Sequence, residues 1–482
     1  MKLEQLLSGV DVLQVNADLD MQITGIAYDS RKVKPGDLFV AVTGFAADGN
    51  RFIPMAMEKG AAAVITTKSV EGVPTVQVRS DRLALSQISA NFYGNPARSM
   101  TLIGVTGTNG KTSTTLLLKH VLETVQGAKV GLIGTMENLI GQTVLPSERT
   151  TPESLDLQAL FARMRDEGCS HVIMEVSSHA IALDRVGGLN YQVAAFTNLT
   201  EDHLDFHKTM EEYAAVKARL FSRCQKAVIN RDDSWAEYMA KKADCPVLTT
   251  SAKTAAGLYA RDIRLLSDGV CFTAVSDTEK ANVSLPIPGK FTVHNALSVL
   301  GIALQLGIGL QNAAQALKTA KGVKGRVEVV PTPGKPYTVL IDYAHTPDGL
   351  ENVLSSVRGF CKGRLIALFG CGGDRDPMKR PIMGKIGTEL SDIAILTSDN
   401  PRTEEPGAIL QDILKGVDVE KTNPVVLENR PQAIRYAMDI AQKDDIIVLA
   451  GKGHETYQEI NGVKYPMDER LIVKEYLEER LV

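Results

Sequence analysis

Apolar residues recur along the chain in short, nearly continuous runs that alternate with segments of helical spacing. Such runs lie at 102–105, 172–176, 193–197 and 227–229, and again at 338–341, 365–369, 393–397 and 445–449. A short continuous apolar run is typical of a strand buried on both faces, and strands that alternate with helices form parallel sheets. The pattern therefore predicts two successive α/β domains, each with a mainly parallel sheet between helices.

The N-terminal region follows a different pattern. Its apolar runs at 39–42 and 61–65 are separated by turn-forming residues, and residues 91–96 are rich in turn formers as well. A chain of 482 residues has room for roughly three domains. We therefore expect an α/β protein with domains at 1–98, 99–328 and 329–482, the last of them doubly wound and Rossmann-like.

Composition narrows the class of protein. Hydrophobic residues make up 44% of the chain, charged residues 23%, and the net charge is −4, so a folded protein without a nucleic-acid partner is expected. No apolar run is long enough to span a membrane, and the first residues do not have the pattern of a signal peptide. The six cysteines are scattered without a CxxC pair, which is typical of reduced thiols. We expect a cytoplasmic monomer.

A glycine-rich loop follows the predicted strand at 102–105 and precedes a helix; its residues are Gly107, Thr108, Asn109, Gly110, Lys111 and Thr112. Glycines let backbone N–H groups converge on phosphate oxygens, and a helix N-terminus favours an anion. Lys111 would contact the β- and γ-phosphates of ATP, and Thr112 would place its hydroxyl on Mg²⁺. The spacing departs from the usual phosphate-loop motif because Val105 stands where its first glycine would fall. A generic turn is the alternative.

The string from Gly107 to Thr112 resembles the ATP loop of the Mur ligases and of the related folylpolyglutamate synthases, and the resemblance extends over the whole chain. It implies an N-terminal domain that binds a UDP-linked substrate and a central domain similar to phosphate-loop ATPases. It also implies a C-terminal domain that binds an amino acid. The implied chemistry is ATP-dependent amide formation.

Candidate metal ligands follow two of the predicted strands. Glu175 ends the run at 172–176, where its carboxylate can ligate Mg²⁺. The family resemblance assigns His203 to a second metal and implies that Lys217 is carbamylated by CO₂. Taken alone, His203 is typical of a polar loop residue, and Lys217 of a surface lysine with a packed stem.

The resemblance also assigns residues to the UDP-linked peptide. Ser30 lies in an Asp-Ser-Arg string before Pro-Gly-Asp, which by itself predicts a plain turn. Thr150 and Thr151 match the loop that holds the muramoyl dipeptide, and Ser177 and Arg185 match further substrate contacts. Hydroxyl and guanidinium donors suit a polyanionic substrate. Leu183 stands where some relatives have a polar contact.

Three further residues are expected at the nucleotide. Asn295 opens a helical run and matches an ATP-binding asparagine of the family. Arg326 would stabilise the transferring phosphoryl group. Asp342 follows a predicted strand and would contact the ribose or assist at the metal. Each of them, taken alone, is a common surface residue.

The ends of three predicted C-terminal strands carry a candidate amino-acid pocket, made of Arg375, Asp399, Asn400, Pro401, Arg402, Gly451 and Glu455. The guanidinium group of each arginine can bind a carboxylate through two hydrogen bonds, and the carboxylate of Glu455 can bind an ammonium. A substrate with an amine and a carboxylate at both ends, as in meso-diaminopimelate, fits this set. The Asp-Asn-Pro-Arg string also resembles the signature of the diaminopimelate-adding Mur ligases, although the turn at Asn400-Pro401 is compatible with either reading.

The expected reaction joins meso-2,6-diaminopimelate to UDP-N-acetylmuramoyl-L-alanyl-D-glutamate through an acyl phosphate, during synthesis of peptidoglycan precursors. Three alternatives stay open at this point. The same ligation could use L-lysine, the protein could be a folylpolyglutamate synthase-like ligase, or it could be a nucleotide-dependent switch. The N-terminal region argues against the folate enzyme, and the arginine-rich third region argues against the switch.

Overall fold

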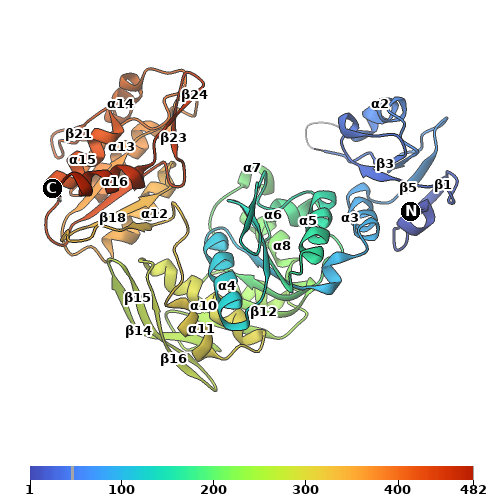
Figure 1. The fold of residues 1–482 in the computed structure, drawn as a ribbon, viewed down its shortest axis with the longest axis horizontal. Coiled ribbons are helices and arrows are strands. Elements are labelled where there is room, and N and C mark those ends of the chain that lie inside the picture. The colour runs from blue at the N-terminus through green and yellow to red at the C-terminus, as the bar shows by residue number, and fades with distance from the viewer. Residues whose placement is uncertain (45–47, 481–482) are drawn as a thin grey trace. The chain divides into compact units, whose positions relative to one another are not determined.

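The computed structural model describes residues 1–44 and 48–480. Contacts divide the chain into two compact units, the first made of residues 1–258 and 297–313 and the second of residues 259–296 and 314–482. Both units are α/β, and their sheets are rich in parallel strands, which confirms the predicted fold class (Figure 1). The domain boundaries near residues 98 and 328 stay a prediction.

The first unit begins with a five-stranded sheet in the order β1 (Val12–Asn16), β5 (Thr75–Val78), β4 (Ala63–Thr66), β3 (Asp37–Val40) and β2 (Gly25–Ala27). Strand β1 is antiparallel to β5, and the other neighbours are parallel. The helices of this region are α1 (Leu3–Leu6), α2 (Ile53–Glu58) and α3 (Asp81–Phe92). Helix α3 packs against α5 (Ser154–Asp166), so the first sheet is joined to the rest of the unit.

A second sheet forms the centre of the first unit. The strands of this sheet that belong to the first unit run in the order β13 (Val247–Ser251), β12 (Cys224–Asn230), β11 (Tyr191–Phe196), β6 (Thr101–Thr106), β10 (His171–Glu175), β7 (Val130–Ile133), β8 (Asn138–Ile140) and β9 (Thr143–Leu145). All neighbours from β13 to β7 are parallel, whereas β8 and β9 form antiparallel pairs. The remaining helices are α4 (Lys111–Gln126), α6 (Ser178–Ala182), α7 (Leu204–His207), α8 (Met210–Ala218) and α9 (Ala236–Lys241).

Strand register brings three loops to one edge of this sheet. Glu175 of β10 pairs with Val105 of β6, and Phe196 of β11 pairs with Thr106. Because the three strands are parallel and end level, the chain leaves all of them on the same side. Ligands of open parallel sheets bind at that edge.

The second unit contains a six-stranded sheet in the order β17 (Glu328–Val330), β18 (Thr338–Asp342), β22 (Ile446–Ala450), β19 (Leu365–Phe369), β20 (Ile393–Leu396) and β21 (Val425–Val426). Only β17 pairs antiparallel in this sheet. Its helices are α12 (Pro347–Arg358), α13 (Lys379–Leu390), α14 (Pro406–Leu414), α15 (Arg430–Ile440) and α16 (Glu469–Glu479).

Both faces of this sheet are buried, because successive side chains of a strand point to opposite faces. Leu340 of β18 packs with α12, α13 and α14 on one face, whereas Val339 and Ile341 pack with α15 and α16 on the other. Strands covered on both sides need apolar residues at every position. This requirement explains why they were visible in the sequence as continuous apolar runs.

The other elements are β14 (Leu258–Leu266), β15 (Gly269–Ser276), β16 (Lys280–Leu285), α10 (Lys290–Gln305), α11 (Leu310–Leu317) and the hairpin of β23 (Tyr457–Ile460) and β24 (Val463–Pro466). Among the residues that the structure describes, no helix has the length and apolar character needed to cross a membrane.

Candidate active site

The glycine-rich loop lies between β6 and the N-terminus of α4. Gly107 and Gly110 adopt φ angles of 147° and 84°, which favour glycine. A Cβ atom added at Gly107 would lie 1.9 Å from Oγ1 of Thr197, so the close approach of the 197–200 segment also requires glycine. The strand, loop and helix arrangement expected of a phosphate site is therefore present.

The segment after β11 holds the loop in this shape. The backbone N–H of Thr108 donates to the carbonyl of Asn198 at 2.8 Å, and that of Asn109 donates to Oδ1 of Asn198 at 2.9 Å. Thr197 donates from its hydroxyl to the carbonyl of Asn109 at 2.6 Å. Sequence reasoning gave Thr197 and Asn198 no role, although their position directly after a parallel strand was a usable signal.

Two lysines converge on the loop. Nζ of Lys111 donates to the carbonyls of Gly107 and Thr108 at 2.9 and 2.8 Å. Lys217, in α8, donates to the same Gly107 carbonyl at 2.9 Å although its side chain is only 1% exposed. Burial holds the pKa of Lys217 well below its usual range, and the charge of Lys111 lowers that pKa further, while Asp202 opposes the shift. Lys217 is therefore a buried lysine at the phosphate loop and not a surface residue.

Thr112 and Glu175 lie together at the start of α4. Thr112 donates from Oγ1 to Oε1 of Glu175 at 2.9 Å. Thr135 also contacts this carboxylate, through its backbone N–H at 3.0 Å and its hydroxyl at 2.9 Å. A carboxylate with nearby hydroxyl groups is an oxygen donor set of the kind that Mg²⁺ prefers. Thr135 was missed by sequence reasoning because it follows a different strand, β7.

His203 lies beside other partners. Its half-exposed ring has Nε2 3.4 Å from a carboxylate oxygen of Asp202, and its centroid is 4.9 Å from that of His179. Among the side chains that the structure describes, no three of His, Cys, Asp or Glu form a group that could hold a metal. The structure thus brings Thr112 and Glu175 together, and His203 contacts neither of them.

The residues expected to bind the peptide form a hydrogen-bonded set. Oγ1 of Thr151 donates to the carbonyl of Glu175 at 2.8 Å and accepts from the N–H of Ser177 at 3.1 Å. Ser177 in turn caps α6. Thr150 contacts the hydroxyl of Thr135 at 3.0 Å, so this set adjoins the carboxylate of Glu175. Ser30 lies in the first sheet region, where its buried hydroxyl contacts the sulfur of Met55 at 3.4 Å.

Three arginines surround Glu153. Its carboxylate lies 2.8 Å from Arg149, 2.9 Å from Arg185 and 3.6 Å from Arg82. Burial lowers the pKa of Arg185, while Glu153 opposes that shift. Three cations around one carboxylate leave a local excess of positive charge, which suits a polyanionic substrate. Arg82 and Arg149 were not found from the sequence because the three arginines come from separate segments.

Three residues of the second unit were expected to contact the nucleotide, and their surroundings differ. Arg326 is exposed, and its guanidinium lies 5.6 Å from the centre of the Tyr343 ring. Asp342 is buried at the end of β18, where its carboxylate accepts from the N–H groups of Val327 and Ala344 at 2.8 and 2.9 Å. Burial raises the pKa of Asp342, and these bonds oppose the shift. Asn295 is buried in α10.

Loops that follow β19 and β20 form one side of the candidate amino-acid pocket. The N–H of Gly373 donates to the carbonyl of Asn400 at 2.9 Å, and Nη1 of Arg402 donates to the carbonyl of Gly373 at 2.7 Å. A Cβ atom added at Gly372 would lie 2.9 Å from Nη1 of Arg402 and 3.8 Å from Cγ of Arg375. The guanidinium of Arg402 and the stem of Arg375 therefore both lie beside Gly372.

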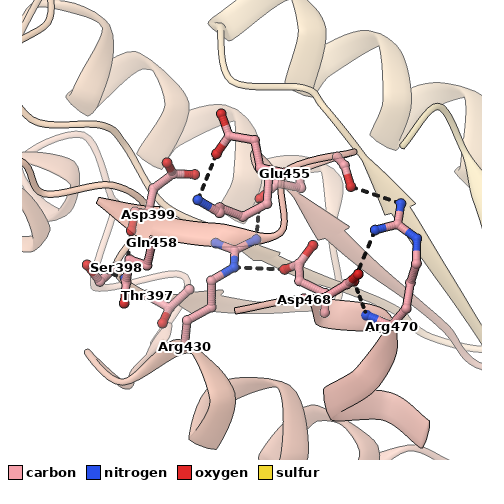
Figure 2. Close-up of polar contacts among 12 residues, drawn as sticks. Thr397, Ser398, Asp399, Arg430, Glu455, Gln458, Asp468 and Arg470 are labelled. Carbon is pink, nitrogen blue, oxygen red and sulfur yellow. Dashed lines mark hydrogen bonds and ion pairs between the residues drawn. The ribbon is translucent and has the colours of Figure 1, made fainter. Parts of the chain in front are cut away.

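The loop after β22 completes the set (Figure 2). Nδ2 of Asn400 donates to Oε2 of Glu455 at 2.9 Å, and Oδ1 of Asp399 accepts from the N–H of Asn400 at 2.7 Å. Gly451 has a φ of 113°, and a Cβ atom there would lie 2.6 Å from Oδ2 of Asp399, so the backbone favours glycine at this position. Pro401 is buried beside them. All seven predicted pocket residues thus belong to loops at one edge of the sheet.

Three successive segments of the chain match domains of one family. Residues 22–93 match the Mur ligase family catalytic domain, residues 105–303 the Mur ligase middle domain, and residues 325–453 the Mur ligase glutamate ligase domain. Together with the phosphate loop and the second parallel sheet, these matches define the class: the chain belongs to the Mur ligase family. The resemblance seen in the sequence is confirmed.

Comparison with individual relatives gives a more specific similarity than the family models do. The chain is 48% identical to the UDP-N-acetylmuramoyl-L-alanyl-D-glutamate–2,6-diaminopimelate ligase of Caldanaerobacter subterraneus subsp. tengcongensis, with 99% of each chain covered. It is 47% identical to the protein of the same name from Clostridium tetani, covering 99% of this chain and 100% of the relative. A solved structure of a ligase with this name superposes with a TM-score of 0.80 at 32% identity, covering 100% and 99% of the two chains. A Mycobacterium tuberculosis folylpolyglutamate synthase structure, at 18% identity and a TM-score of 0.60 with 83% of this chain and 95% of that chain covered, shares the fold alone.

Proposed function

We propose that the protein ligates meso-2,6-diaminopimelate to UDP-N-acetylmuramoyl-L-alanyl-D-glutamate, using ATP and forming ADP and phosphate. The observation that carries the proposal is the pocket in which Arg402, Arg375 and Glu455 stand on contacting loops, because its two guanidinium forks and one carboxylate match a diamino dicarboxylic acid. Relatives that carry this name are similar to the chain over its full length.

The reaction proceeds in two steps. An oxygen of the glutamate γ-carboxylate attacks the γ-phosphorus of ATP, the bond to the bridging oxygen breaks, and ADP leaves. The amine of the incoming amino acid then attacks the acyl carbon, phosphate leaves, and the amine loses a proton. Lys111 balances the charge of the β- and γ-phosphates, and Arg326 stabilises the phosphoryl group as it moves.

Two groups supplied from solution fit residues of this chain. Thr112 and Glu175 would hold Mg²⁺, which supplies neutralisation of phosphate charge. Lys217 would carry the carbamate, because its buried position and lowered pKa favour the neutral amine to which CO₂ adds. The carbamate would place an anion beside Lys111 at the phosphate loop.

An acceptor comparison tests the proposal. Phosphate release and ligated product are measured with ATP, Mg²⁺ and the UDP-linked dipeptide, with meso-diaminopimelate, with L-lysine and without amino acid. We expect product only with the dipeptide, and far more with meso-diaminopimelate than with L-lysine. Equal use of L-lysine would favour the lysine-adding reaction. Activity with a folate acceptor would favour the folylpolyglutamate alternative, and ATP hydrolysis without any ligated product would favour the switch.

A further inference from the structure

Lys452 carries a charge that the reaction does not explain. It follows β22 in the loop at 451–455, and its side chain is 0% exposed. A fully buried ammonium is costly unless it is paired and hydrogen-bonded. An apolar side chain would fill this position without that cost. Packing alone therefore does not explain why a charged residue stands here.

The ammonium joins two residues of the amino-acid pocket. Nζ of Lys452 donates to Oδ1 of Asn400 and to Oε2 of Glu455, both at 2.7 Å. It also lies 5.3 Å from the centre of the Tyr457 ring. Lys452 thus links the loop after β20 to the loop after β22, and Figure 2 shows the ion pair at Glu455.

Protein contacts fix both partners. Oδ1 of Asn400 accepts a second bond, from the N–H of Glu459 at 2.9 Å, and Nδ2 donates to Glu455 at 2.9 Å. The amide oxygen of Asn400 therefore has no acceptor position left for a substrate. Both bonds to Glu455 end on Oε2, and no hydrogen bond among the described residues uses Oε1. These contacts therefore hold the carboxylate in one orientation and leave Oε1 available to a substrate.

We propose that Lys452 is a positioning residue of the amino-acid pocket, which holds Asn400 and Glu455 so that Oε1 of Glu455 receives the ammonium of the amino-acid substrate. This inference rests on the proposed function. Pocket groups must be held within a fraction of an ångström to act, and buried partners provide that support. Burial raises the pKa of Glu455, but Lys452 and Asn400 lower it to below its usual value, so the carboxylate stays ionised and able to pair with an ammonium.

The test replaces Lys452 with methionine, which has a similar length and no charge. We expect Lys452→Met to raise KM for meso-diaminopimelate about tenfold or more while KM for ATP stays within about twofold, since the lost interaction acts on the amino acid alone. Lys452→Arg, which keeps the charge, should restore part of the affinity. An unchanged KM for meso-diaminopimelate in folded Lys452→Met would overturn the proposal.

A matched control separates positioning from stability. Arg364 is a cation paired with Asp445 at 2.7 Å, and the two residues precede β19 and β22, at the opposite edge of the sheet from the pocket. Arg364→Met should lower the melting temperature and leave the KM for the amino acid unchanged. If it raises this KM as much as Lys452→Met does, the effect of Lys452 is general destabilisation and the proposal is wrong.

A double variant covers the case in which Lys452→Met alone does not fold. Combining it with Glu455→Gln removes both charges, so neither is left buried and unpaired. Without a carboxylate to orient, Lys452→Met should change KM by less than about twofold in the Glu455→Gln background, because the two residues act as one unit. A rise in KM of about tenfold or more when Lys452→Met is added to Glu455→Gln would refute positioning. The proposed function fails separately, if the wild-type protein does not ligate meso-diaminopimelate at all.

Discussion

Replacing Arg402 with alanine removes one guanidinium group from the amino-acid pocket and leaves the backbone strain at this position unchanged. Arg402 has a φ of 51°, in the left-handed region, and alanine carries the same steric cost there as arginine. The side chain donates to the carbonyl of Gly373 at 2.7 Å and pairs with Glu459 at 3.3 Å. Its other N–H groups are sufficient for a substrate carboxylate, because a guanidinium has five donors.

The magnitude follows from the bond that is lost. A hydrogen bond to a charged group contributes about 1.5–3 kcal/mol. Losing the one between Arg402 and the distal carboxylate should therefore lower kcat/KM for meso-diaminopimelate roughly 10- to 150-fold. L-Lysine lacks that carboxylate, so its already poor use should change far less. The wild-type preference for meso-diaminopimelate, expected to be at least about tens-fold, should shrink accordingly.

The assay titrates each amino acid at saturating ATP and UDP-linked dipeptide, for both proteins. Thr403→Ala is the control, since its hydroxyl ties the same two loops through Asp374 at 2.6 Å without belonging to the pocket. The control should keep the preference and the KM for ATP. A wild-type protein that uses both amino acids equally, or an Arg402→Ala variant with an unchanged ratio, would show that Arg402 does not select the substrate.

Three further predictions concern the phosphate loop. Lys111→Ala should abolish ligation in a folded protein, because the phosphates lose their cation; near-normal turnover would contradict the assignment. Lys217→Ala should be nearly inactive and partly rescued by small carboxylates such as formate, and full activity without them would exclude the carbamate. Gly107→Ala should lower kcat/KM at least about a hundredfold, since its Cβ would meet Thr197 at 1.9 Å. Gly127→Ala, with φ 61° and open space around it, should change stability by only about 1–2 kcal/mol and leave kcat/KM alone; equal effects of both glycines would refute the steric argument.

The sequence by itself determined the elements and their order. Strands such as β19 and β22 are buried on both faces, so every position is apolar and the run is visible without knowledge of its neighbours. The phosphate loop was equally accessible, because its glycines, lysine and threonine lie within six consecutive residues. Parallel strands then place their following loops at one edge, which is why the pocket residues could be grouped in advance.

The partners of these residues were decided only by the tertiary structure. Lys217 has the sequence context of a surface lysine, and its burial depends on the carbonyl of Gly107, far away in the chain. The contacts of Arg82 and Arg185 with Glu153 and the bond between Lys452 and Asn400 likewise join segments that no local pattern relates. The spacing of apolar residues shows which face of an element is buried, but the position of a charged residue in the sequence does not show its partners. What surrounds it, and hence whether it binds substrate or holds another side chain, is fixed only when distant segments pack together.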